Sequence, residues 1–308
     1  MAQDAVVSDV GVSAGGLGKA VAAAIVQFNK ANVTQQCITM SPAPAGTNVV
    51  QFPVYTKHDV TNATHGVKNM ASGAEETDAN LTNIETTAVS VEVLRNAIRA
   101  EITDLAAHGN ADSLLVNAGL QLGNDIAKEF DIAVCELFDG FATEKGSSGN
   151  GLRFIDIMDA LASLEANDAP RPYHAVLHPL QVFGTFGLSN EFGSSAVQGS
   201  NGAFNGLAGS GGVADQFIGA GFVTSIAGIN IYTSTSVPAT GDQHKGGIFA
   251  NTAIGCGYID FGGGSFMQMA QEREEVSAKT VLVANGYYAV SELVDLHGVE
   301  ILSETSTA

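Results

Sequence analysis

The residues best suited to chemistry lie near the start of the chain. Residues 11–20 read Gly-Val-Ser-Ala-Gly-Gly-Leu-Gly-Lys-Ala, and Asn117-Ala-Gly follows further along. Glycines spaced in this way let a backbone turn approach the pyrophosphate of a dinucleotide at the start of a helix. The same run places Ser13 in a Gly-x-Ser-x-Gly pattern, which is typical of a hydrolase nucleophile. Both chemistries need further residues, so each can be tested on the sequence.

The sequence lacks the further residues that either chemistry would need. The glycine run looks like that of a short-chain dehydrogenase, which needs a tyrosine with a lysine four residues later to lower the tyrosine pKa. The residues four positions after the six tyrosines are Asp59, Leu177, Ser236, Gly262, Ser291 and Glu292. A hydrolase oxyanion hole draws on a loop that precedes the nucleophile, and only twelve residues precede Ser13. A flexible glycine arm is the favoured interpretation.

Histidine and cysteine spacing also favours structural roles. His174 and His178 are four residues apart, but their stretch reads as a strand and lacks the helical glutamate of a zinc protease. The three cysteines are odd in number and far apart, which indicates reduced thiols and neither a disulfide framework nor a zinc site; they are Cys37, Cys135 and Cys256. We expect no catalytic residue, no cofactor and no metal, and therefore no enzyme.

Composition narrows the class of protein. The chain has 308 residues, enough for one elaborate domain or two, and its 45% hydrophobic content excludes a disordered chain. Lys and Arg total 13 against 32 Asp and Glu, a net charge of −19. Such a chain does not bind nucleic acid by neutralising phosphates, although an acidic wall could enclose DNA without adhering to it. We expect no signal peptide, no membrane segment and a cytoplasmic setting.

The most informative stretch is 49–94. Residues 49–60 and 85–94 read as strands, and 61–83 form a soft polar tip between them. Pro53 restricts the first strand to an edge or a two-stranded ribbon, because proline donates no ladder hydrogen bond. The second strand alternates with period two, with apolar Val89, Val91 and Val93. The stretch has little with which to form its own core, so it predicts a protruding hairpin that contacts other copies of the chain.

A long helix is predicted after this hairpin. A short helix at 96–108 leads into one at about 110–141, where apolar residues recur every four positions and form one inclined stripe. The stripe comprises Leu114, Ala118, Leu122, Ile126, Phe130, Val134 and Phe138. Gly119 and Gly123 weaken the helix but let another backbone approach it.

The rest of the chain predicts a mixed helix and strand body. A helix is expected at 154–164, a buried strand at 173–178 and a further helix from Pro179. Five more strands are expected, with a hairpin turn at 284–287 because Asn-Gly tolerates positive φ; they are 222–233, 247–259, 267–276, 279–284 and 288–302.

The order of these elements resembles the major capsid proteins of tailed bacteriophages, of the Hong Kong 97 type. The hairpin is similar to that family's E-loop, and the two helices are similar to its link and spine helix. Two later stretches are similar to the family's helix, strand and turn, and to its late strand pair. The stretches are 52–91, 95–141, 155–179 and 227–251. His178 stands where the family commonly has Asn.

The resemblance implies an α+β capsid fold with an N-terminal arm (1–45), an E-loop (46–95), a P domain (96–150 and 262–308) and an A domain (151–261). It implies a late structural protein that self-assembles into hexamers and pentamers of an icosahedral virion enclosing double-stranded DNA. Assembly in the host cytoplasm is expected. The long N-terminal scaffolding extension of some members is absent from this sequence, so either a separate scaffolding protein or cleavage before its first residue is expected. A portal and a possible cement protein are expected as further partners.

The residues expected at contacts between subunits lie on the hairpin and the link. They are Phe52, Tyr55, Lys57, Lys68, Glu75, Glu76, Arg95 and Arg99. Two alternatives stay open. An encapsulin-like nanocompartment would have the same fold with a protein cargo, and a short-chain dehydrogenase-like enzyme would have another fold.

Overall fold

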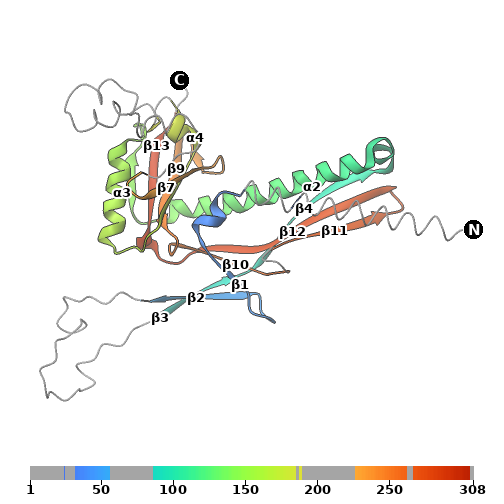
Figure 1. The fold of residues 1–308 in the computed structure, drawn as a ribbon, viewed down its shortest axis with the longest axis horizontal. Helices are drawn as coiled ribbons and strands as arrows, with labels where there is room; N and C mark the ends of the chain where they lie inside the picture. Colours follow the sequence, from blue (N-terminus) through green and yellow to red (C-terminus); the bar gives the residue numbers. More distant parts are fainter. Residues whose placement is uncertain are drawn as a thin grey trace, which may run out of the picture.

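The computed structural model describes residues 24, 32–55, 86–184, 187–188, 226–261 and 266–305. Within them the strands form three sheets. Figure 1 shows a long layer of helix and sheet that extends from a shorter lobe, with a narrow ribbon leaving the region where the two meet. The mixed helix and sheet architecture confirms the predicted α+β class.

The long layer consists of a helix lying along a sheet. Its central strand, β12, pairs with β4 along one edge, and with β11 and then β10 along the other. The short strand β1 continues the sheet by pairing in parallel with β10. The elements are α2 (Asp104–Cys135), β1 (Thr39–Pro42), β4 (Leu94–Thr103), β10 (Ile254–Tyr258), β11 (Met267–Glu274) and β12 (Lys279–Glu292).

The apolar stripe of α2 forms the core of this layer, as predicted. Leu122, Ile126, Phe130 and Val134 are all at most 4% exposed. The Phe130 ring lies 5.4 Å from that of Phe266 and 5.0 Å from that of Tyr288, measured between centroids. Tyr288 belongs to β12 and Phe266 directly precedes β11, so these ring contacts hold the helix along the sheet.

The ends of the long helix differ from the prediction of 110–141. The helix begins at Asp104 and ends at Cys135, and the 3-10 helix η3 (Glu136–Gly140) follows it. The close backbone approach expected at the glycines is confirmed at Gly123. A Cβ placed there would lie 2.3 Å from the carbonyl oxygen of Ala24, closer than any real contact allows. The close approach of the Ala24 backbone therefore requires a glycine at position 123.

Two predicted local structures are wrong. The short helix at 96–108 is largely the strand β4. Ile98, Ala100 and Ile102 turn toward α2 and alternate with exposed residues, and the open edge of β12 supplies the hydrogen bonds. The hairpin turn at 284–287 does not exist, because β12 runs through it. The chain reverses instead at 275–278, where Ala278 adopts a φ of 46°.

The shorter lobe contains a sheet in the order β5-β13-β9-β6-β7, with β8 beside β9. The predicted helix at 154–164, buried strand at 173–178 and helix from Pro179 are confirmed as α3, β6 and α4. The elements are β5 (Glu144–Ser147), α3 (Phe154–Ala166), β6 (Tyr173–Leu177), α4 (Pro179–Phe183), β7 (Ile229–Thr233), β8 (Ala239–Thr240), β9 (Gln243–Ala250), the 3-10 helix η4 (Asp295–His297) and β13 (Gly298–Glu304).

Three further strand predictions needed correction in this region. The stretch 247–259 is divided between β9 and β10 by a turn at 251–253. The stretch 288–302 contains the end of β12, then η4, then the start of β13. Within 222–233, the described strand is β7, and residues 222–225 lie outside the described residues.

The strands of the two sheets interleave along the chain. β10 lies within 151–261 but pairs in the long layer, whereas β13 lies within 262–308 but pairs in the shorter lobe. The sheets therefore do not follow the boundary at 261, and the division into A and P domains remains a prediction.

Hydrogen bonds join the segments in which the chain passes from one sheet to the other. The Leu293 amide donates to the Ala253 carbonyl at 2.7 Å, and the Ala142 amide donates to Asp295 Oδ1 at 2.7 Å. A third hydrogen bond of 2.8 Å joins Thr252 Oγ1 and His297 Nδ1. These hydrogen bonds therefore join the connecting segments at the junction between the lobe and the long layer.

Candidate assembly interface

The predicted hairpin exists as a two-stranded ribbon. β2 (Val49–Tyr55) pairs antiparallel with β3 (Thr86–Glu92), and Pro53 stands opposite Ala88. Because the ribbon has only two strands, the missing N–H of proline leaves no central ladder broken. Figure 1 shows the ribbon leaving the body below β10 and β1.

The root of the ribbon is anchored on its own subunit. Val50, Phe52, Val91 and Val93 form a small buried cluster that also touches Tyr287 and Leu293 of the long layer. A Cβ on Gly257 of β10 would lie 2.9 Å from Val50 Cγ2, so glycine permits this close packing. Phe52, predicted at a subunit contact, is 6% exposed within one chain and serves as an anchor.

Most of the other predicted contact residues of the hairpin lie outside the described residues. These are Lys57, Lys68, Glu75 and Glu76, together with the expected tip at 61–83. Tyr55 is the last residue of β2, where it pairs with Thr86. The roles of all these residues at contacts remain proposals.

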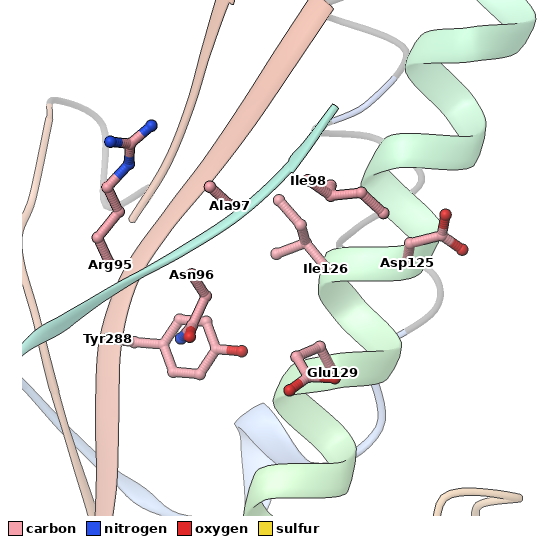
Figure 2. Close-up of a pocket in the computed structure, with 8 residues that line it drawn as sticks. All are labelled: Arg95, Asn96, Ala97, Ile98, Asp125, Ile126, Glu129 and Tyr288. Atoms are coloured by element: carbon pink, nitrogen blue, oxygen red, sulfur yellow. The ribbon is translucent and has the colours of Figure 1, made fainter. Parts of the chain in front are cut away.

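The two link arginines lie on one face of β4, the face turned away from α2. Arg95 Nε donates to Asn285 Oδ1 at 2.8 Å, which fixes that side chain on the sheet. Arg99 has a side chain 72% exposed and lies 3.4 Å from Glu101, an ion pair of small energetic value. The spacing of four would bring two residues together on a helix, but on the strand β4 it only places both arginines on the same face, each with its own partner. Figure 2, a close-up of the pocket between β4 and α2, shows Arg95 pointing away from the helix and Ile98 facing it.

The hairpin between β11 and β12 carries an exposed apolar residue at its tip. Val276 is 99% exposed. Around it, Arg273 binds both carboxylate oxygens of Asp104 at 2.9 and 2.8 Å, and Lys279 lies 3.0 Å from Glu101 and from Glu274. These exposed ion pairs link the two strands of the hairpin to each other, to β4 and to the start of α2. The predicted strands 267–276 and 279–284 leave a break inside this turn, but no sequence pattern indicated that Val276 stands exposed at its tip.

Further exposed apolar side chains occur on both parts of the molecule. The ring of Phe261 packs on that of Tyr287 with centroids 4.9 Å apart, yet Phe261 remains 46% exposed. The others are Leu94, Ile155, Phe183 and Leu296. Scattered singly, such residues are ordinary on the surface of a monomer.

The histidines and cysteines considered above for catalysis or metal binding contribute to the packing and capping of the fold. His174 is buried in β6, and His178 caps α4 by accepting from the Leu180 amide at 3.2 Å. The three cysteines are free and buried, and burial raises the thiol pKa to about 12 for Cys37 and Cys256, so these thiols are unreactive. Among the described residues, no group of three or more His, Cys, Asp or Glu could hold a metal.

The glycine run at 11–20 lies outside the described residues, and Asn117 is an exposed residue of α2. No helix in the part of the chain that the structure describes has both the length and the apolar character to cross a membrane.

No protein-family model and no curated protein matches the sequence. Solved structures do match. The capsid of the cyanophage P-SCSP1u has a TM-score of 0.62 at 17% identity, over 90% of this chain and 89% of that one. The capsid of Ralstonia phage GP4 has a TM-score of 0.64 at 10% identity, over 87% of each chain. The chain has the Hong Kong 97-type capsid fold.

The same fold occurs in a protein compartment. The holo-SrpI encapsulin complex from Synechococcus elongatus matches with a TM-score of 0.56 at 12% identity, over 88% of this chain and 86% of that one. In terms of this fold, β2–β3 is the root of the E-loop and α2 is the spine helix. Because phage heads and an encapsulin share the architecture, the fold by itself does not choose between them.

Proposed function

We propose that this chain is a major capsid protein that self-assembles into the hexamers and pentamers of an icosahedral phage head enclosing double-stranded DNA. The observation that carries the proposal is the ribbon β2–β3, whose root is anchored on its own subunit and which leaves the body. The Hong Kong 97-type fold supports a structural role and no enzymatic one.

The proposed assembly mechanism follows from the position of the ribbon. Residues 61–83 reach over a neighbouring subunit and add contact area that one subunit does not bury alone. Many weak, repeated contacts then produce a stable shell, because each contact raises the effective concentration of the next. Lys57, Lys68, Arg95 and Arg99 form ion pairs between subunits, each worth about 0–1 kcal/mol. Buried apolar area therefore supplies most of the assembly free energy.

The charge of the chain suits a container for DNA. A net charge of −19 disfavours adhesion of DNA to the wall, so the packaged duplex stays free to be released. The proposal includes assembly in the host cytoplasm and a location in the virion. It also includes a separate scaffolding protein, a portal and a possible cement protein as partners.

A deletion of residues 61–83 tests the proposal. The deleted chain is expected to remain folded, with the thermal unfolding midpoint of the unassembled full-length chain, because the ribbon root and both sheets keep their cores. Electron microscopy of the purified protein is expected to show no closed shells, whereas the full-length chain forms them under the same conditions. Normal particles from the deleted chain would refute the role of the E-loop.

An encapsulin-like compartment is the second candidate, and the likeness to the encapsulin from Synechococcus elongatus favours it. The contents of purified particles discriminate. Nuclease-protected double-stranded DNA supports the phage head, whereas a co-purifying enzyme inside the shell supports the compartment. The third alternative, a short-chain dehydrogenase-like enzyme, would have another fold, and the Hong Kong 97-type fold of the chain argues against it.

A further inference from the structure

Two histidine rings stack on each other at one end of the sheet of the shorter lobe. His178 directly precedes α4, and His244 lies in β9. Their ring centroids are 3.8 Å apart and their planes are inclined by 27°. Both residues are partly buried. The fold therefore holds two titratable rings in contact although they come from separate parts of the chain.

Hydrogen bonds assign one neutral tautomer to each ring. His178 Nδ1 accepts from the Leu180 amide, so its proton is on Nε2. The Thr305 hydroxyl donates its hydrogen to the Asp242 carbonyl at 3.1 Å. The contact of 2.5 Å between Thr305 Oγ1 and His244 Nδ1 is therefore donated by the histidine. His244 can then take a second proton on Nε2 without losing this bond, whereas His178 can take one only by losing its acceptor.

The pair belongs to a set of bonds that hold α4 on the sheet. Gln181 of α4 is fully buried, and its Oε1 accepts from the His178 amide at 2.9 Å. Its Nε2 donates to the His244 carbonyl at 3.0 Å and to Ser303 Oγ at 2.8 Å, on β9 and β13. The helix α4 has only five residues, and so short a helix is not stable by itself. Its position therefore depends on these bonds.

No carboxylate among the described residues balances a proton on either ring. Neither α4 nor β8 has an ionisable side chain. Asp242 bonds to the segment beside His244 through its main-chain carbonyl, and the Glu304 carboxylate lies next to Gly149. Burial and the neighbouring His244 lower the pKa of His178, burial lowers that of His244, and no described carboxylate opposes either effect.

The nearest cation is occupied on the other side of the strand. Lys245 follows His244 in β9, and successive side chains of a strand point to opposite faces. Its ammonium pairs with Asp139 and lies 3.3 Å from Glu300. These three charged groups therefore compensate one another and leave the histidine pair uncompensated.

We propose that the stacked histidines are an acid-sensitive latch that holds α4 on the sheet of the shorter lobe and releases it when His178 is protonated. A proton on His178 Nδ1 removes the acceptor of the Leu180 amide, and two imidazolium rings in contact repel each other. Once α4 is released, His178 binds its proton with ordinary affinity. The open form therefore binds more protons, and it becomes more populated as the pH falls below about 6.5. The latch does not depend on whether the chain forms shells.

Hydrogen exchange of the unassembled subunit at pH 7.5 and pH 5 tests the latch. Two amides report on α4, because the Leu180 amide bonds to His178 and the Gly184 amide bonds to the Leu180 carbonyl at 3.0 Å. Their protection factors, which correct for the intrinsic effect of pH on exchange, are expected to fall about fivefold or more at pH 5. They are also expected to lie well below those of the β12 amides. Equal protection of α4 and β12 at pH 5 would show global unfolding and no release of α4.

Variants separate the latch from other titrations. His178→Asn keeps a capping acceptor that does not titrate, and its two amides are expected to lose less than about twofold in protection. His297→Gln removes a partly buried histidine of η4, away from the pair, and is expected to behave as the parent does. The same loss of protection in His178→Asn as in the parent would overturn the proposal.

The contact between the rings has a test of its own. His244→Gln keeps a donor for Thr305 but removes the second charge, so the pKa of His178, followed through its ring signals by NMR, is expected to rise. An unchanged pKa of His178 in this variant would show that the stacked rings are not coupled.

Discussion

His178 begins α4 by accepting the Leu180 amide on Nδ1, while its ring stacks on that of His244 with centroids 3.8 Å apart. Burial, and then His244, lowers the pKa of His178 to about 4. A proton on Nδ1 would remove the acceptor and place charge beside the second ring. The folded state therefore binds fewer protons than the unfolded chain between pH 4 and about 6.5, and its stability falls as the pH falls through that window.

His178→Asn is expected to reduce this loss by about 1 kcal/mol at pH 5, a value discounted for the partial exposure of the ring. Asparagine retains the capping acceptor but does not titrate. Urea unfolding of the unassembled parent and variant at pH 5 and pH 8 measures the effect. The difference between the two proteins cancels the titration of the carboxylates. Equal pH dependence in both would show that His178 is not the titrating group.

Asp131 of the spine helix binds the backbone of the N-terminal arm at Val33 and Thr34. Its buried carboxylate accepts the Thr34 amide at 3.0 Å, the Thr34 hydroxyl at 2.7 Å and the Val33 amide at 3.1 Å. Asp131→Asn would place an NH₂ group against one of these donors, and we expect a loss of about 1–3 kcal/mol in the free energy of unfolding.

Hydrogen exchange of the Val33 and Thr34 amides checks where the loss arises, since a loosened arm would exchange faster. Asp159→Asn, an exposed change on α3, is the control and should alter stability by less than about 0.5 kcal/mol. Unchanged exchange at both amides in Asp131→Asn would contradict the fastening role.

Among the elements, those with a strong periodic pattern could be predicted from the sequence. The four-residue stripe of the spine helix and the alternating valines of β3 each place their apolar side chains on one buried face. The strand β4 could not be predicted in this way, because Ala97, Arg99 and Glu101 also have high helix propensity. Its strand structure depends on an edge of β12 that lies far away in the sequence. Asn285-Gly286 predicted a turn that does not form, again because of tertiary contacts: Gly286 lies in β12 and packs against Tyr288 and Ile126.

The tip of the β11–β12 hairpin gives a prediction at this scale. Val276→Asp should leave the unfolding free energy of the unassembled subunit unchanged within about 0.5 kcal/mol, because the side chain is fully exposed. Shell yield is expected to fall, because a carboxylate buried at a contact between subunits is costly. Microscopy and light scattering measure the yield, and Val276→Ala, which adds no charge, is the control. Undiminished yield in Val276→Asp would place the tip outside the contacts.

For the whole molecule, the order of the elements predicted the Hong Kong 97-type fold, but not the interleaving of the two sheets. Periodicity identifies a strand and does not say which sheet it joins. β9 and β10 follow each other closely in the chain and belong to different sheets because the three-residue turn at 251–253 redirects the backbone. The pocket between β4 and α2 was equally hidden, since its residues come from three separate parts of the chain.

The net charge of −19 predicts how assembly responds to salt. Subunits repel one another, and raising the ionic strength from about 0.01 to about 0.15 M shortens the Debye length from about 30 to about 8 Å. We expect the subunit concentration needed for shells to fall over that range, as measured by light scattering. If it rises instead, the attraction of ion pairs between subunits would outweigh the charge repulsion between them. The unfolding free energy of the unassembled subunit over the same range is the control.

The bonded crossings between the lobe and the long layer have a consequence for evolution. The backbone enters the lobe after η3, leaves it between β9 and β10, and returns between β12 and β13. No single cut in the gene separates one sheet from the other, so neither half can be exchanged with a related protein by one recombination event. Selection must therefore act on the subunit as an inseparable unit, and novelty is easiest to add at the ribbon or the hairpin tip.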